Sequence, residues 1–150
     1  MRRMTGVLVV LLAGLAQAAI AADVGQIKTA KGKVLVVRNG QEMAAAVGTP
    51  LQQSDRIVTK ADGSAGIAFK DNSLLSLGPD SSLDISRFSF GEQGQADALE
   101  ATLNRGTLSA VSGKIVARTP EAMQIRTPTT VLGVRGTEFF VKVTDPEDCQ

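Results

Sequence analysis

The segment Thr127-Pro-Thr-Thr-Val-Leu-Gly-Val-Arg-Gly-Thr-Glu-Phe-Phe-Val-Lys-Val143 combines the composition of a strand with an arginine held between two glycines. Beyond Thr137 the apolar residues fall at every second position, at Phe139, Val141 and Val143. This alternation is typical of a strand with one buried face. Phe140 interrupts it and predicts that the opposite face is also partly covered. The segment therefore indicates a β domain.

Gly133 and Gly136 bracket Arg135. Glycine within a strand pattern usually marks a bulge or a close approach of another backbone, and this arrangement can turn the forked guanidinium inward. Arg135 then has two interpretations. It is either a scaffold residue paired with a buried carboxylate, which we favour, or a direct contact for a ligand or partner.

Short runs of alternating or β-branched residues continue along the chain and are separated by glycine, proline, asparagine and aspartate. Such runs recur roughly every ten residues, which is typical of a sandwich, roll or solenoid. We predict one all-β domain of short strands in a twisted solenoid-like or roll/sandwich arrangement. The predicted strands are 33–38, 41–47, 51–59, 65–69, 75–77, 83–85, 114–118 and 123–127.

Residues 98–103 fit either one helical turn or a strand, because alanine and glutamate favour helix while the next residues resemble a strand. We favour a strand that pairs with 107–111 through a turn at 104–106.

Arg2 and Arg3 precede an apolar run, Val7–Leu15, and alanine-rich small residues. This pattern predicts a signal peptide at residues 1–21 and export to the periplasm or beyond. The run is shorter than the ~20 residues of a membrane span, so we expect no span after cleavage. The remaining chain divides into a β domain at 22–144 and an acidic tail at 145–150.

The charge and composition disfavour several classes of function. With 16 basic and 15 acidic residues, the chain has no basic excess typical of nucleic-acid binding. It contains no histidine or tyrosine, and its only cysteine, Cys149, is next to the C-terminus. We therefore expect no enzyme, no cofactor and no metal site. Cys149 is either an idle thiol or an intermolecular bridge.

The order of landmarks resembles the FecR-type periplasmic domain over nearly all of the predicted mature chain. The resemblance begins with Gly25, Ile27, Gly32, Val34 and Val36, and continues through Gly48, Leu51, Asp55, Ile57 and Thr59. Its later landmarks include Ser64 to Phe69, Asp71, Pro79, Leu103 and Gly106. The signature segment is matched by Thr127, Pro128, Gly133, Arg135, Gly136, Thr137 and Phe139.

The resemblance implies an all-β periplasmic domain that contacts other proteins. In its best-known members, the domain lies outside a transmembrane helix and relays a signal from an outer-membrane transporter to a sigma factor. We expect this chain to be a stand-alone exported member without those regions, with an open sheet edge beyond Val143. Because Asp55 and Arg135 match strong family positions, we also predict that they form an inward ion pair.

The predicted function is a protein-interaction or signal-sensing accessory module that binds another envelope protein. The alternative is a structural or self-assembling cell-envelope protein that associates through its open sheet edge.

Overall fold

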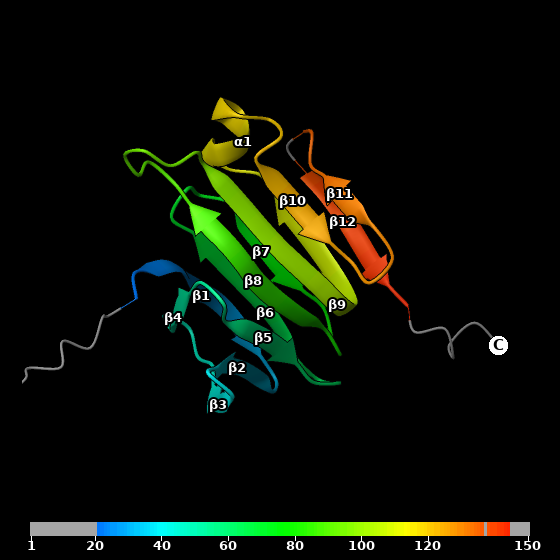
Figure 1. Cartoon of the computed structure of the whole chain (residues 1–150). Helices are drawn as coiled ribbons and strands as arrows, with labels where there is room; N and C mark the ends of the chain where they lie inside the picture. Colours follow the sequence, from blue (N-terminus) through cyan, green and yellow to red (C-terminus); the bar gives the residue numbers. More distant parts are fainter. Residues whose placement is uncertain (1–20, 137, 145–150) are drawn as a thin grey trace, which may run out of the picture.

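The structure is a computed structural model that describes residues 21–136 and 138–144 (Figure 1). Its strands are β1 (Asp23–Lys31), β2 (Val34–Arg38), β3 (Gln41–Ala44), β4 (Pro50–Gln52), β5 (Arg56–Thr59), β6 (Ser64–Phe69), β7 (Leu74–Leu77), β8 (Ser82–Ser89), β9 (Ala98–Val111), β10 (Met123–Arg126), β11 (Val131–Gly133) and β12 (Glu138–Val143). The short helix α1 covers Lys114–Arg118. The predicted all-β class is therefore confirmed.

The strands form one curled sheet in which β9 belongs to both layers. One layer has the order β3-β2-β5-β8-β9-β10-β11, and the other has the order β4-β1-β6-β7-β9-β12. All pairs are antiparallel except β9 with β10. Of the arrangements predicted, the roll is the one observed.

Gly106 bends β9 where the strand passes from one layer to the other. Ala98–Arg105 pairs with β8, whereas Gly106–Val111 pairs with β12. Gly106 has a φ of +92°, and a Cβ at this position would lie 2.1 Å from the Ser81 hydroxyl oxygen. The chain folds back at the predicted turn 104–106, because the two ends of β9 lie at the same end of the domain (Figure 1). The predicted pairing of 98–103 with 107–111 is wrong, because these two halves of β9 lie in different layers and pair with other strands.

The predicted strand at 114–118 is also wrong, because this segment forms the helix α1. A contact distant in sequence explains the difference. The Lys114 amide donates to the carbonyl oxygen of Asp71 at 2.8 Å, and the Ile115 amide donates to its carboxylate at 3.2 Å. These bonds hold the first helical turn while Ile115 and Val116 are buried in the core.

The alternation of apolar residues predicts the core well. Ala65, Ile67 and Phe69 of β6 are buried, and Phe139, Val141 and Val143 of β12 pack against the same core. Phe140, by contrast, is 67% exposed, so the expected cover on the opposite face of β12 is wrong. Within the described residues, no helix is long and apolar enough to cross a membrane.

Two predicted strands are shorter than expected. The run 51–59 divides into β4 and β5 at a turn, where Ser54 has a φ of +74° and the Asp55 amide donates to the Gln52 carbonyl oxygen. The run 41–47 is paired only as far as Ala44. In both cases the residues that were predicted as strand but are not paired form the turn that leads into the next strand.

Candidate partner-binding surface

The Thr127–Val143 segment lies at one side of the roll, where each layer ends (Figure 1). Thr127 and Pro128 begin the turn between β10 and β11. The Thr127 amide donates to the Thr130 carbonyl oxygen at 2.8 Å, and the Thr130 amide donates to Oγ1 of Thr127 at 3.1 Å. Pro128 stabilises this turn because its ring presets φ. These two residues therefore shape a hairpin at the surface.

Arg135 lies outside the core, in the link between β11 and β12. Its Nη2 donates to Oε1 of Glu121 at 3.2 Å, and the two side chains are 79% and 77% exposed. The predicted inward ion pair between Arg135 and Asp55 is therefore wrong. Gly133 ends β11 and Gly136 belongs to the link that follows, and neither glycine turns the arginine toward the core.

Asp55 is buried and binds Arg38 instead. Its carboxylate accepts hydrogen bonds from Nε of Arg38 at 2.8 Å, from Nη2 at 2.7 Å, and from the Gln52 amide at 2.8 Å. The hydrogen bond from Arg38 to Asp55 raises the pKa of the guanidinium above its ordinary value, although burial acts in the opposite direction. Asp55 is thus a scaffold residue, in a pair that sequence reasoning missed.

Thr59 is also a scaffold residue. Its buried hydroxyl donates to the Gly78 carbonyl oxygen at 2.6 Å and accepts from the Ser81 amide at 2.9 Å. It thereby joins β5 to the loop before β8. Phe139 packs partly buried against the core, and Thr137 lies outside the described residues.

The two signature glycines differ in what their positions require. A Cβ on Gly133 or Gly136 would meet no atom within 4 Å. Gly136 has a φ of +121°, which favours glycine, but Gly133 has neither a positive φ nor a close neighbour. Close packing therefore explains neither residue, and this end of the signature faces outward.

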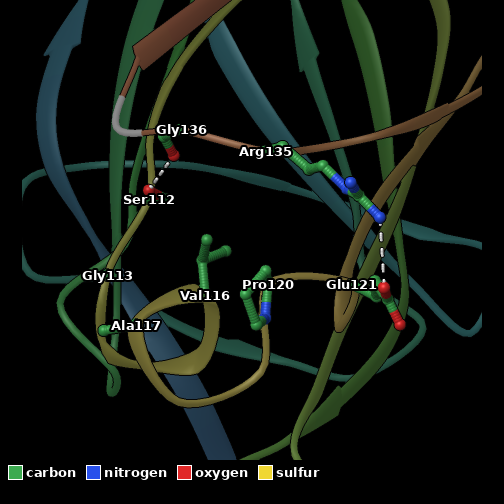
Figure 2. Close-up of a pocket in the computed structure, with 8 residues that line it drawn as sticks. All are labelled: Ser112, Gly113, Val116, Ala117, Pro120, Glu121, Arg135 and Gly136. Carbon is green, nitrogen blue, oxygen red and sulfur yellow. Dashed lines mark hydrogen bonds and ion pairs between the residues drawn. The ribbon is translucent and has the colours of Figure 1, made fainter.

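Arg135 forms the rim of a hollow of about 560 Å³, here called the Arg135 hollow (Figure 2). Val116, Ala117 and Pro120 supply its apolar surface, and Arg135 extends across it toward Glu121 (Figure 2). The remaining lining residues are Ser112, Gly113 and Gly136. The Ser112 hydroxyl donates to the Gly136 carbonyl oxygen at 2.6 Å, which joins the end of β9 to the link before β12.

A buried polar network positions this hollow. The Asp71 carboxylate accepts from the Ser73 hydroxyl at 2.6 Å and from the Ile115 amide at 3.2 Å. The Ser73 hydroxyl oxygen in turn accepts from the Gly113 amide at 3.0 Å. A Cβ on Gly113 would lie 2.3 Å from the Asp71 carbonyl oxygen, so only glycine permits this approach. The turn between β6 and β7 thus fixes where α1 begins.

The Arg135 hollow has the chemistry of a contact site. An exposed ion pair contributes only about 0 to 1 kcal/mol to the stability of a protein. The pair between Arg135 and Glu121 can therefore break at little cost, and each side chain can pair with a charge on a partner instead. The adjoining apolar surface would accept a small apolar side chain. Within the described ranges 21–136 and 138–144, no cluster of three acidic, histidine or cysteine residues has the geometry of a metal site.

A second depression of about 470 Å³ follows the other end of the segment and is here called the β12 groove. Its lining residues are Asn104, Thr127, Pro128, Thr129, Thr130, Leu132, Phe140, Val141, Lys142, Val143 and Thr144. It therefore lies between the β10–β11 hairpin and the edge of β12. The signature segment contributes to both hollows.

Comparison with protein families matches residues 55–149 to the family described as FecR protein. The chain belongs to the FecR family. The match begins at Asp55 and extends past Val143, so it includes both the buried Asp55–Thr59 landmarks and the exposed signature segment of this FecR domain. The resemblance from Gly25 to Leu51, before this match, stays a prediction. Neither a curated protein nor a solved structure matches the chain.

In this FecR domain, sequence reasoning finds Arg135 but misses the residues that surround it. The sequence pattern places Pro120 and Glu121 in a connection and Val116 in a strand. The only local signal is the Pro120-Glu121 pair directly before a predicted strand, which marks a turn but does not indicate where that turn lies. The contact depends on how β9 brings α1 beside the β11–β12 link.

Proposed function

We propose that this chain is an exported, periplasmic protein-interaction module that serves as an accessory in signal sensing and has no catalytic role. The contact surface is the Arg135 hollow with the adjoining link between β11 and β12. One observation carries the proposal: the signature residues Arg135 and Gly136 are exposed and line a hollow, whereas the landmarks Asp55 and Thr59 are buried.

Composition and the predicted leader support the same proposal. The sequence has no histidine or tyrosine, which removes common acid–base and nucleophilic groups. A signal peptide at residues 1–21 would deliver the domain to the periplasm, where envelope proteins are the available partners. The partner is expected to present a small apolar side chain beside a charged group.

A matched pair of arginine variants tests this surface. Arg135→Ala and Arg87→Ala each remove an exposed arginine from a weak ion pair, but only Arg135 lines the hollow. A photocrosslinking residue at Ala117 should capture a discrete envelope protein in the native chain and in Arg87→Ala. Arg135→Ala should lose that product, while the free energy of unfolding changes by less than about 0.5 kcal/mol in either variant. Equal capture by all three proteins would refute the proposed contact.

A structural, self-assembling envelope protein is the second candidate function. The observation that favours it is β12, which pairs only with β9 among the strands of the described region. An open edge presents unpaired backbone groups that can recruit another strand. Analytical ultracentrifugation separates the two candidates, because the interaction module remains one defined species while a structural protein forms larger species as concentration rises.

A further inference from the structure

We propose that the open edge of β12 pairs with β12 of a second copy of this chain, in an antiparallel register centred on Phe140. This inference rests on the second candidate function and is independent of a partner at the Arg135 hollow. The inference identifies a second copy of the chain as the molecule that binds the open edge of β12. It also identifies the residues of β12 that favour this pairing.

The accessible edge is the first argument. β12 lies at the end of its layer, and its only strand partner within residues 21–136 and 138–144 is β9, from Glu138–Val111 to Val143–Gly106. Backbone groups on the other side of a terminal strand can form a new ladder. Such pairing would extend the layer without rearranging its existing strands.

The order of charges along β12 is the second argument. Glu138, Phe140 and Lys142 alternate with the core-facing residues and are all exposed. With Phe140 opposite its own copy, Glu138 lies opposite Lys142 of the second copy, and the same pair recurs across the twofold axis. Directly opposed charges of opposite sign stabilise a strand pair, whereas like charges destabilise it. β12 is therefore electrostatically complementary to itself.

The surroundings of these charges strengthen the complementarity. On the neighbouring strand the residues opposite Glu138, Phe140 and Lys142 are Val111, Ser109 and Thr107, and none is charged. Neither Glu138 nor Lys142 forms an ion pair within the described part of the chain. A second copy would supply a counter-charge for each.

Apolar contacts agree with the same register. Phe140, 67% exposed, would contact its own copy, and aromatic cross-strand pairs add to strand association. On the core-facing side Phe139 would lie opposite Val141 of the second copy. The contact would be isologous, since each chain presents the same strand to the other.

Charge exchange provides the main test. Sedimentation equilibrium of the protein purified from cells expressing the whole chain should show a dimer. Glu138→Lys or Lys142→Glu creates two like-charge pairs and should raise the dimer dissociation constant about tenfold or more. The double variant Glu138→Lys with Lys142→Glu restores both opposite-charge pairs and should restore the dimer. Failure of the double variant to recover association would overturn the proposed register.

A cysteine at the axis provides an independent test. Opposed strand residues have Cα atoms about 4.5 to 5.5 Å apart, within the range of a disulfide. In a Cys149→Ser background, Phe140→Cys should form an intermolecular disulfide. Leu74→Cys is the control, because Leu74 is exposed on the same face but lies on β7. Equal crosslinking of both variants would refute the assignment.

Two further outcomes would also overturn the inference. A monomer at all accessible concentrations, with no intermolecular disulfide in the Phe140→Cys variant, would show that the β10–β11 hairpin or another segment closes this edge to a second copy. Larger assemblies that persist unchanged in Glu138→Lys would place self-association at another surface, leaving the structural function intact but refuting the β12 contact.

Discussion

Arg38 holds the buried Asp55 carboxylate through two hydrogen bonds, from Nε at 2.8 Å and from Nη2 at 2.7 Å. Asp55 is 1% exposed and Arg38 is 26% exposed. The arginine at the end of β2 therefore fixes the turn between β4 and β5. This pair, and not the signature arginine, neutralises the acidic residue that begins the family match.

Arg38→Ala should destabilise the domain by about 3 kcal/mol, because it leaves a buried carboxylate without its counter-ion. Urea denaturation of the variant and of Arg38→Lys measures the loss. Lysine keeps the charge but lacks the two-pronged geometry, so its loss should be intermediate. A change below about 1 kcal/mol in Arg38→Ala would contradict a stabilising role for the pair.

Asp71→Ala should destabilise the domain by about 2 to 3 kcal/mol, because buried amides and a hydroxyl lose their acceptor. The Ile115 amide donates to this carboxylate, so its hydrogen exchange should accelerate more than that of the Leu108 amide within β9. Lys70→Ala, on the exposed neighbour of the same turn, is the control and should change stability little. Equal effects of the two substitutions would argue against the network.

Three glycines provide a graded test of backbone requirements. Gly106→Ala combines a positive φ with close contact to Ser81 and should cost about 3 kcal/mol or more. Gly136→Ala has only the positive φ and should cost about 1 to 2 kcal/mol. Gly133→Ala should be close to neutral. Thermal unfolding of the three variants checks this order, and a large loss in Gly133→Ala would reveal a packing constraint absent from the described contacts.

Asp84 should make stability fall at acidic pH. Its partial burial favours the protonated form, but hydrogen bonds from Arg56 and Asn104, together with the Arg56 charge, outweigh burial and lower its pKa below the usual 3.8. The folded state thus binds this proton less readily than the unfolded state. The stabilisation is present above the unfolded pKa and is lost as pH falls through the lower folded pKa.

Asp84→Asn isolates this contribution. At neutral pH the variant should be less stable by about 1 kcal/mol, the scale of a partly exposed ion pair. The difference between the two proteins should shrink below the usual carboxyl pKa. Urea denaturation at a series of pH values measures it, and a difference that stays constant into strong acid would contradict the assignment.

The strands are predictable where a single residue pattern decides them. Ala65, Ile67 and Phe69 alternate and are buried, as expected. The helix α1 is not predictable, because its first turn depends on Asp71, far away in the sequence. The partner of Asp55 is missed for the same reason. Arg38 and Arg135 both lie in strand-like segments and have similar local sequence chemistry. Which of them reaches the Asp55 carboxylate depends on how the strands pair in the folded sheet.

The position of the site in the sequence is predictable, but the direction in which the Arg135 side chain points is not. Gly136 correctly marks an unusual piece of backbone, with a φ of +121°, whereas Gly133 does not. The same glycine pattern is compatible with an arginine that points inward or outward. The fold determines the direction, because β9 brings α1 and Glu121 to the outer side of the β11–β12 link.

The bend at Gly106 makes β9 a common member of both layers, so neither layer can lose this strand while the other remains intact. Unfolding should therefore be a single cooperative event. A force applied along β12 would act directly on this shared strand, and the domain would transmit it as one stiff unit to the strands on the opposite side.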